Sequence, residues 1–274
     1  MFKFNFNSEN DENNEKESMI EDKTASTVAK ESKLIEFNSN QYAEISESLP
    51  NYSCQMFTSN EVEIGYIENL KINENSKSDL ESGIYEGGFK IWECTQDLAD
   101  YFTNEYSQNE FEGKIVCDLG CSAGILGILA LKKGAKVVHF QDYNDDVLQN
   151  STVFNVVLNC EEEEIPEAFN KCSFYSGDWD NFRELTSNQD KYDIILTSET
   201  IYNPQNYLKL TNFFKSRLKK DGKIFLAAKS HYFGVGGNTF DFCKHLNDDG
   251  AFSHEIIWKS SEGLKREILL IQFK

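Results

Sequence analysis

The sequence predicts an α/β fold in which a mostly parallel β-sheet carries helices on both faces. Short apolar runs alternate with segments of helical periodicity between residues 93 and 246, and this alternation is typical of a parallel sheet whose strands are joined by helices. Two apolar runs without a helix between them, 252–258 and 265–273, close the chain, and Glu262-Gly263 supplies the turn that joins them. We therefore expect one strand to enter the sheet antiparallel to its neighbours.

The individual elements follow from these runs. Five strands are expected at 114–119, 137–141, 173–176, 193–197 and 223–228. Five helices are expected at 93–106, 125–132, 146–158, 204–218 and 239–246. The closing pair brings the sheet to seven strands in a Rossmann-like arrangement, one of them antiparallel. Because this ending separates class I methyltransferases from dehydrogenases, we predict the class I methyltransferase fold.

Composition divides the chain into three parts. Residues 1–50 hold five Lys against eleven Asp or Glu, a net charge of −6 (5 − 11). Low hydropathy combined with net charge favours disorder, so we expect a disordered acidic tail there, with a partner-binding arm as the alternative. Residues 51–87 are predicted to form an N-terminal extension, with a small hairpin or a cover built from the apolar patches near 62–67. The methyltransferase domain is expected over 88–274.

Charge and cysteine usage exclude several classes of protein. The net charge of −19 argues against a nucleic-acid substrate, because an acidic surface repels phosphates, whereas basic proteins would be attracted. The seven cysteines include no C-x-x-C pair, so we expect no metal site, and reduced thiols in a reducing compartment. No apolar run reaches the ~18 residues of a membrane span. We expect an intracellular monomer without a membrane partner.

The first predicted strand and the turn after it indicate the ligand. The run Lys114-Ile-Val-Cys-Asp-Leu-Gly-Cys-Ser-Ala-Gly124 ends in a glycine-bearing turn, and the next strand ends at Asp142, 22 residues after Gly120. Such a unit holds a nucleoside: Gly120 and Gly124 allow close approach, and Asp142 accepts hydrogen bonds from the ribose hydroxyls. Asp118 is expected to order the loop or to meet the cofactor's ammonium. The spacing favours S-adenosylmethionine over a dinucleotide, which needs G-x-G-x-x-G; a packed βαβ unit without a ligand is the alternative.

Further motifs point to one family. They are Gly88-Phe-Lys-Ile-Trp-Glu-Cys-Thr95, Gln141-Asp-Tyr-Asn144, Ser176-Gly-Asp-Trp179, Leu196-Thr-Ser-Glu-Thr-Ile-Tyr-Asn-Pro204, His231-Tyr-Phe-Gly-Val-Gly-Gly237 and Glu262-Gly-Leu-Lys-Arg266. Over residues 84–274 the chain thereby resembles the protein-histidine N-methyltransferase family. The resemblance implies S-adenosylmethionine-dependent methylation of a histidine, at the tele nitrogen, in a large-subunit ribosomal protein. It also implies location in the cytoplasm and the nucleus.

The resemblance further implies which residues contact the cofactor. They are Ile91, Trp92, Glu93, Cys94, Thr95, Gly120, Asp142, Tyr143, Asn144, Gly177, Asp178, Trp179 and Ser198. Trp92 can lie across the methionine half, and Thr95 can bind the carboxylate at a helix N-terminus. Asp178 can accept from the adenine amino group while Trp179 stacks on the ring. Alternatively, Trp92 is a core anchor with Thr95 as its N-cap, and Asp178-Trp179 is a plain turn.

The segment after the fourth strand indicates the acceptor. Enzymes that methylate DNA or glutamine amides carry N-P-P-Y there, whereas this chain has Ser198-Glu-Thr-Ile-Tyr202. The acidic residue three before a tyrosine resembles protein methylators, so we predict a protein side chain as the acceptor. Neutral imidazole needs only a partner that fixes its tautomer, and the candidates are Glu199, Tyr202, Asn203 and His231. A helix-capping Glu199 and a structural His231 are the alternatives.

Two further points bear on function. Ser122 and Ala123 stand where the family's glycine loop has Gly-Ser, and a side chain at 122 demands an allowed φ and narrows the approach to the cofactor. Two other functions remain open. One is a protein-lysine methyltransferase of the same fold, and the other is a cofactor-binding ribosome assembly factor without catalysis.

Overall fold

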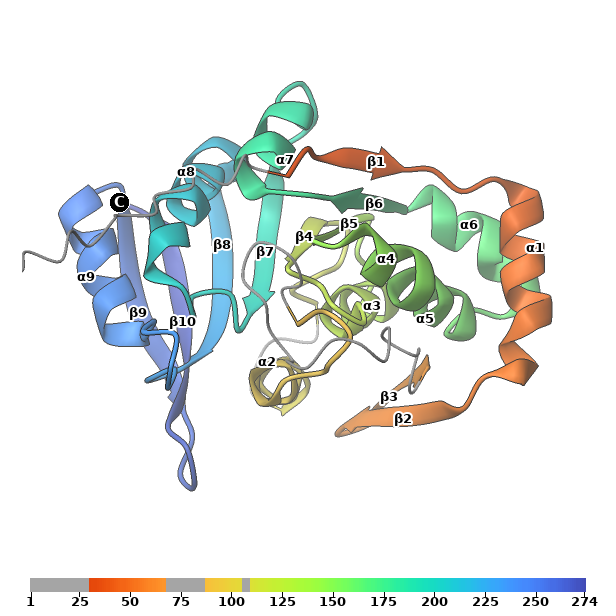
Figure 1. Cartoon of the computed structure of the whole chain (residues 1–274), viewed down its shortest axis with the longest axis horizontal. Helices are drawn as coiled ribbons and strands as arrows, with labels where there is room; N and C mark the ends of the chain where they lie inside the picture. Colours follow the sequence, from red (N-terminus) through yellow and green to blue (C-terminus); the bar gives the residue numbers. More distant parts are fainter. Residues whose placement is uncertain (1–29, 68–86, 105–108) are drawn as a thin grey trace, which may run out of the picture.

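The computed structural model describes residues 30–67, 87–104 and 109–274 of the chain. One eight-stranded sheet runs through it, in the order β1-β6-β5-β4-β7-β8-β10-β9 (Figure 1). Its strands are β1 Lys33–Ile35, β4 Ile115–Leu119, β5 Val137–Asp142, β6 Cys172–Ser176, β7 Tyr192–Ser198, β8 Leu218–Lys229, β9 Phe252–Lys259 and β10 Arg266–Phe273.

The predicted sheet is present within this larger one. Strands β6, β5, β4, β7 and β8 are parallel to one another, while β10 runs antiparallel to both of its neighbours. The α/β fold with a mostly parallel sheet is therefore confirmed. Strand order along the sheet reverses between β4 and β7, and in open α/β sheets such a reversal is where ligands bind.

Strand β1 corrects the strand count at one edge of the sheet. It pairs antiparallel with β6, so the sheet has eight strands and two of them are antiparallel, not seven with one. Ser32 Oγ strengthens this edge by donating to the Ser176 carbonyl over 2.6 Å. A three-residue strand with an exposed Leu34 leaves almost no alternating pattern in the sequence, which is why it was not predicted.

Helix α1, Ser39–Ser48, corrects the prediction of a disordered tail over 1–50. Asn38 and Gln41 form a capping box at its start, and the Tyr42 ring stacks on Phe169 with 3.6 Å between centroids. The prediction is wrong for residues 30–50, and residues 1–29 lie outside the described part. Average polarity over the segment concealed a short apolar cluster, which comprises Ile35, Phe37, Tyr42 and Ile45.

Helices cover both faces of the sheet. The helices on one face are α2 Glu93–Asn104, α3 Ile125–Lys132, α4 Asp145–Val147 and α5 Val153–Leu158, and those on the other are α7 Trp179–Leu185, α8 Tyr207–Arg217 and α9 Thr239–Asp249 (Figure 1). A π-helical turn, η2 Leu148–Thr152, joins α4 to α5. Alternate side chains of each strand enter opposite cores, so Val116 packs on one face while Cys117 and Leu119 pack on the other.

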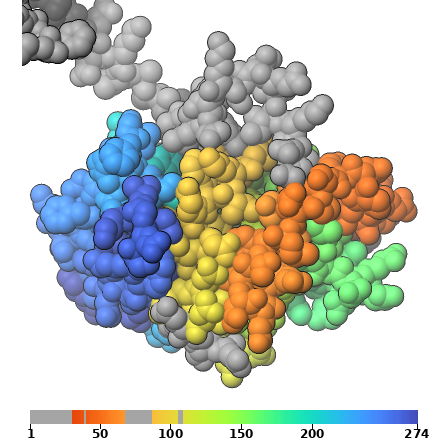
Figure 2. All heavy atoms as spheres, turned by 90° about the horizontal axis from the view of Figure 1, so that it is seen from below, coloured from red at the N-terminus to blue at the C-terminus, as the bar shows by residue number. Residues whose placement is uncertain are grey.

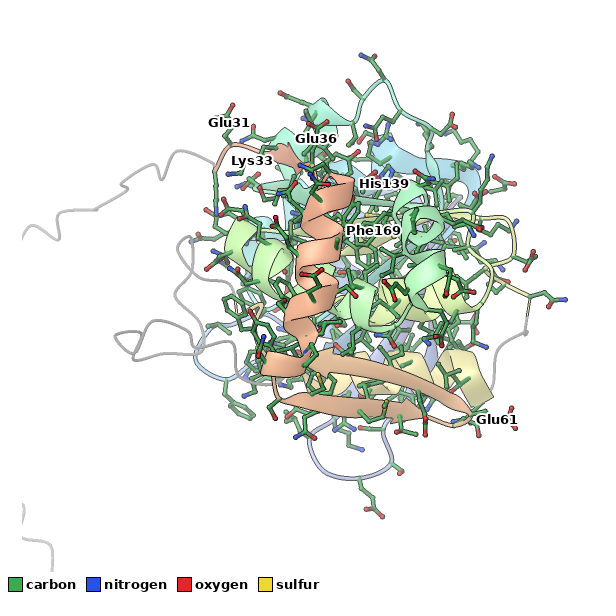
Figure 3. All side chains as sticks on the ribbon, turned by 90° about the vertical axis from the view of Figure 1, so that its right-hand side faces the viewer. Glu31, Lys33, Glu36, Glu61, His139 and Phe169 are labelled. Carbon is green, nitrogen blue, oxygen red and sulfur yellow. The ribbon has the colours of Figure 1, made fainter. Side chains whose placement is uncertain are left out.

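The remaining elements are short. They are η1 Leu49–Asn51, β2 Cys54–Ser59, β3 Val62–Ile67, η3 Glu162–Glu164, α6 Ile165–Asn170 and η4 Pro204–Asn206. Strands β2 and β3 pair as a separate hairpin beside α2, as the orange and gold segments of Figure 2 show, and its Phe57 and Ile64 are buried. Figure 3 shows α1 crossing the side of the domain from β1 to this hairpin. No helix in the described residues is long and apolar enough to span a membrane.

Candidate active site

The candidate site lies at the carboxyl edge of the sheet, where β4, β5, β7 and β8 end. Their last residues are Leu119, Asp142, Ser198 and Lys229. The segments that follow β4 and β7 lead to α3 and α8, which pack on opposite faces of the sheet. Because the chain diverges there, the turns after these strands face a common ligand-binding edge.

The turn after β4 depends on a left-handed backbone. The φ angle is +70° at Gly120, +52° at Ser122 and +78° at Gly124. A Cβ on Gly120 would lie 2.8 Å from Thr200 Cγ2, so this glycine lets the turn approach the segment after β7. A Cβ on Gly124 would lie 2.8 Å from Thr152 Cγ2. Gly124 therefore serves the packing of the turn against η2.

The carboxylate of Asp142 is buried at the end of β5 and fixes the glycine turn. Its Oδ2 accepts from Ser122 N over 3.0 Å, and its Oδ1 accepts from Asn144 N over 3.0 Å. A carboxylate offers about four acceptor positions, so the predicted bonds from two ribose hydroxyls are compatible with both backbone contacts. The remaining acceptor positions of Asp142 at this edge therefore fit the ribose hydroxyls of a nucleoside.

Ser122 joins the glycine turn to the segment before α2. Its Oγ donates to the Gly88 carbonyl over 2.6 Å and lies 3.1 Å from the Lys90 carbonyl. A Cβ on Gly88 would lie 3.1 Å from Asp142 Oδ1, so this segment passes directly beside the buried carboxylate. The departure from the family's glycine loop thus provides a tether that glycine could not supply.

Asp118 has a different partner from the predicted ammonium. It is fully buried, and its Oδ2 accepts from Gly127 N over 2.8 Å in the first turn of α3. Burial raises its pKa to about 8, against the lowering effect of this hydrogen bond. Asp118 therefore orders the start of α3, which was one of its two predicted roles.

The start of α2 meets the end of β7 through two hydroxyls. Thr95 Oγ1 and Ser198 Oγ lie 2.8 Å apart, so the two predicted cofactor contacts are adjacent. The indole of Trp92 donates to the Gly87 carbonyl over 3.2 Å, which fixes its ring beside the same helix terminus. A hydroxyl pair at a helix N-terminus can bind a carboxylate, as predicted for the methionine half of the cofactor.

Three side chains of the 91–95 segment have other surroundings. Ile91 packs against the main core, and the thiol of Cys94 is completely buried, which raises its pKa. The carboxylate of Glu93 lies 3.0 Å from Lys229 Nζ. The backbone hydrogen bond at the helix start and the bond from Lys229 hold the pKa of Glu93 below its usual value.

The residues predicted to surround adenosine come directly after β5, at Tyr143 and Asn144, and directly after β6, at 177–179. Asn144 is buried, and the Tyr143 ring lies 5.2 Å from Lys30 Nζ. Trp179 Nε1 donates to Gln141 Oε1 over 3.0 Å. At Gly177, φ is +105° and a Cβ would lie 2.4 Å from the Glu31 carbonyl. That glycine therefore accommodates the segment leading to β1.

Asp178 is engaged in structural bonds. Its Oδ1 accepts from Asp180 N over 3.0 Å as the N-cap of α7. Its Oδ2 lies 2.6 Å from Lys209 Nζ. The segment 177–179, for which a plain turn was the alternative, thus leads into a helix. A hydrogen bond from the adenine amino group would have to share an Asp178 oxygen that already has a partner.

Glu199 has the most unusual environment of the predicted acceptor residues. It follows β7 with φ at +59°, a strained conformation for a residue with a Cβ. Its side chain is 7% exposed, and the buried Cys94 thiol and Tyr232 hydroxyl interact with its carboxylate, although neither oxygen has a hydrogen bond of good geometry from the described residues. Lys229 Nζ lies 3.4 Å from Oε1. A buried carboxylate in this state favours a ligand that brings an N–H donor.

The other three acceptor candidates differ in position. The ring of Tyr202 lies 6.4 Å from that of Tyr232, in the same region as Glu199. Asn203 Oδ1 accepts from Gln205 N over 3.0 Å and caps η4. His231 is exposed, and its ring packs edge-on against Phe233 at 4.7 Å. The structure therefore groups Tyr202 with Glu199 and gives Asn203 and His231 other contacts.

Sequence reasoning missed Lys229 as a partner of the site. It ends β8, and its Nζ lies within 3.4 Å of both Glu93 and Glu199. Tyr232, which lies in the motif His231–Gly237, is buried next to Lys229, and its Oη accepts a hydrogen bond from Lys229 N over 3.2 Å. The signal in the sequence was that the apolar run of β8 ends in Lys229, while the run of β7 ends in Ser198 and is followed by Glu199.

Comparisons with known proteins agree with this geometry. A family model described as lysine methyltransferase matches residues 67–245. The histidine protein methyltransferase 1 homologue of Bos taurus is 46% identical over 73% of this chain and 59% of its own length. The Mus musculus homologue is 43% identical over 73% of this chain and 60% of its own length. The chain thus spans about three fifths of these curated relatives.

A solved structure supports the fold. SMU.776, a candidate methyltransferase complexed with SAH, superposes with a TM-score of 0.56 at 12% identity, over 80% of this chain and 55% of that chain. The class I methyltransferase fold is confirmed by this likeness and by the strand order. The resemblance to histidine protein methyltransferases is confirmed by the two relatives. Since the family model covers most of the domain, the chain belongs to the lysine methyltransferase family.

Proposed function

We propose that this chain is an S-adenosylmethionine-dependent protein-histidine N-methyltransferase. Its relatives at 46% and 43% identity carry the name histidine protein methyltransferase. The finer parts of the proposal are that the acceptor is a histidine of a basic large-subunit ribosomal protein, and that the tele nitrogen is methylated. The net charge of −19 supports a basic substrate. The action of a monomer in the cytoplasm and the nucleus stays a prediction.

One observation carries the choice of acceptor. Glu199 is a buried carboxylate beside Ser198 at the carboxyl edge of the sheet, and its oxygens have no hydrogen bond of good geometry from the described residues. Imidazole has two ring nitrogens, and the one that is not methylated can donate its N–H to this carboxylate. That bond would hold the tautomer in which the other nitrogen carries the free electron pair.

The residues at the edge fit the cofactor. Asp142 is buried with backbone donors on both oxygens and capacity for more, and the Thr95–Ser198 hydroxyl pair lies at a helix start. When bound, S-adenosylmethionine supplies an electrophilic methyl group. Asp142 would hold the ribose, and the start of α2 would hold the methionine carboxylate.

The remaining chemistry needs orientation more than acid–base strength. Imidazole with a pKa near ~6.5 is mostly neutral at pH 7, so its free nitrogen is already nucleophilic. Glu199 orients the ring and stabilises the positive charge that the ring acquires when it is alkylated. It can also take the N–H proton from the alkylated ring, which restores a neutral product. Catalysis then rests mainly on positioning and on exclusion of water.

Lysine is the second candidate acceptor, because the matching family model is described as lysine methyltransferase. A buried carboxylate could equally receive an ammonium. The two acceptors differ in protonation, since lysine with a pKa near ~10.4 must lose a proton before it can react. A non-catalytic assembly factor is the third reading, and it would bind the cofactor without turnover.

A peptide assay with labelled cofactor tests the proposal. Two basic peptides that differ only in having His or Lys as the single acceptor would be incubated with the full chain across pH ~5.5–9. We expect label in the histidine peptide, with a rate that rises through pH ~6–7 and then flattens as imidazole deprotonates. Equal or better labelling of the lysine peptide would overturn the histidine assignment. Cofactor binding without label in either peptide would favour the assembly factor.

A further inference from the structure

We propose that Lys229 is a positioning residue of this site, which holds the Glu199 carboxylate in place to accept the substrate's N–H and ties it to the cofactor-facing start of α2. The inference rests on the proposed function and deepens it. It adds the cation that the buried carboxylate requires and a link between the two halves of the site.

The first step is the geometry of a three-membered charge cluster. Lys229 Nζ lies 3.0 Å from Glu93 Oε2 and 3.4 Å from Glu199 Oε1. Its side chain is 12% exposed, that of Glu199 is 7% exposed and that of Glu93 is 61% exposed. Lys229 therefore connects a solvent-facing carboxylate on α2 with a buried one after β7.

The second step is the fixation of Lys229 on aromatic surfaces. Its Nζ lies 5.0 Å from the centroid of the Trp92 ring and 6.0 Å from that of Tyr232. Contacts of an ammonium with ring faces are attractive and favour one side-chain position. Trp92 is itself held by the Gly87 carbonyl. Trp92 from the segment before α2 and Tyr232 from the loop after β8 thus hold the ammonium between the two carboxylates.

The third step concerns the backbone. Glu199 N donates to the Ala227 carbonyl over 2.9 Å, and Lys229 N donates to Tyr232 Oη over 3.2 Å. The first bond ties the segment after β7 to β8, and the second ties the end of β8 to the loop that follows it, so backbone contacts fix both Glu199 and the lysine. The charge pair is therefore preformed in the fold.

The fourth step is the electrostatic balance. Burial lowers the pKa of Lys229, but the charge of Glu199 and the bond to Glu93 outweigh that effect and raise it. The lysine therefore stays charged at neutral pH. The Glu199 carboxylate loses hydration through burial, and the charged lysine beside it replaces part of that stabilisation.

The other charged and titratable groups around the cluster do not replace Lys229. On α2, Asp97 is bound by Arg266 of β10 through both oxygens, and Cys94 has a raised pKa because it is buried. In the segment before α2, Lys90 Nζ lies 4.5 Å from the centroid of the Trp92 ring. In the loop after β8, burial raises the pKa of Tyr232 well above its usual value. Within the described residues, Lys229 is the cation within 4.0 Å of Glu199.

The consequence is a positioning role for Lys229 in turnover. With the lysine in place, the Glu199 carboxylate is held where it can accept the N–H of the substrate ring and face the charge of the alkylated ring. Without the lysine, Glu199 loses its charged neighbour and its link to α2, so the loss should appear in kcat.

The test compares Lys229→Met, Lys229→Arg and Glu93→Gln in the full chain, with Lys215→Met as the matched control. Lys215 is also a half-buried lysine bound to a carboxylate, that of Asp249 at 2.6 Å, but it joins α8 to α9. The measurements are cofactor affinity by calorimetry and kcat with the histidine peptide. The arginine variant retains the charge and guards against a fold that fails without it.

We expect Lys229→Met to lower kcat by about tenfold or more at pH 7. Lys229→Arg should restore most of kcat, Glu93→Gln should lie between, and Lys215→Met should match the wild type. A Lys229→Met kcat equal to that of the Lys215→Met control, or a Lys229→Arg kcat no better than that of Lys229→Met at normal cofactor affinity, would overturn the inference alone. Absence of wild-type turnover on the histidine peptide would overturn the proposed function and this inference together.

Discussion

Ser122 illustrates how a single residue combines a cost with a structural gain. Its φ of +52° belongs to the left-handed region, which costs a residue with a Cβ about 1–2 kcal/mol. The hydroxyl compensates through its contacts with the Gly88 and Lys90 carbonyls. The residue thereby holds the segment before α2 beside Asp142, where glycine would leave that segment less restrained.

Two substitutions of Ser122 should separate the cost of the backbone strain from the gain of the hydroxyl contacts. Ser122→Ala keeps the strain and loses the hydroxyl contacts, so we expect it to lower the free energy of unfolding by about 1–3 kcal/mol. Ser122→Gly loses the same contacts but relieves the strain, so it should be the more stable of the two variants. Urea unfolding of the three proteins measures this order. An alanine variant as stable as the wild type would show that the hydroxyl contributes nothing.

Asp118 should make stability depend on pH. Its pKa is raised to about 8 in the folded chain by burial, whereas an unfolded Asp titrates near ~3.9. The folded state therefore keeps a proton that the unfolded state loses, and the free energy of unfolding falls as the pH rises through ~4–8. Asp118→Asn cannot titrate, so its stability should fall less across that window. Parallel stability curves for the two proteins, from urea unfolding between pH ~5 and ~8, would contradict the assignment.

At the scale of elements, β1 and α1 form part of the domain. They contribute the β1–β6 pairing, the Ser32–Ser176 bond and the stacking of Tyr42 on Phe169. The segment that leads into β1 also lies beside Gly177, where a Cβ would meet the Glu31 carbonyl at 2.4 Å. The turn that leads from β6 towards the site is therefore shaped in part by the segment before β1.

Removal of residues 1–50 should consequently destabilise the fold. We expect the melting temperature to fall by about 4 °C or more, because a sheet edge and an aromatic stack are lost. Removal of residues 1–29 keeps every one of these contacts and serves as the control, which should melt like the full chain. Equal melting temperatures for all three proteins would show that β1 and α1 add no stability.

The sequence revealed the elements that carry strong local patterns. The apolar runs of β4 to β10 and the helix over 125–132 were predicted within a few residues, because five or more consecutive positions repeat one periodicity. Helix α7 was not predicted: Asp178 and Trp179 were interpreted as adenine contacts, with a plain turn as the alternative, because the Asp178 cap and Trp179 also suit a nucleotide-binding loop. Short elements such as β1 and α6 lack enough positions to produce a pattern.

The candidate site was predictable to the same degree. Asp142 and Ser198 were found from their places at strand ends, because carboxyl ends of parallel strands meet at one edge. The pairing of Lys229 with Glu199 was not predicted, although Glu199 lies in a recognised motif and Lys229 comes two residues before another. It depends on the register between β7 and β8, which pairs Ser198 with Ala227, and no local pattern encodes that register.

At the scale of the whole molecule, charge decides which partners approach. The chain carries a net charge of −19, and its acidic groups include the solvent-facing Glu93 beside the candidate site. A basic protein would be drawn to such a surface, and association of this kind weakens as salt screens the charges. In the proposed function the acceptor side chain is held by Glu199, which is buried and therefore screened far less.

Salt should therefore act on substrate capture and leave the chemical step nearly unchanged. With a basic histidine peptide, we expect kcat/KM to fall by about tenfold or more between ~0.05 and ~0.5 M salt, because the Debye length shrinks from more than ~10 Å to less than ~8 Å. In the same range kcat should change by less than about twofold, since Lys229 and Glu199 are already paired inside the protein. A control peptide in which Gln replaces the basic residues around the acceptor should start with a low kcat/KM and respond little to salt. If the basic peptide were as insensitive as the control, the acidic surface would have no role in recruitment, and the proposal of a basic protein substrate would lose its support.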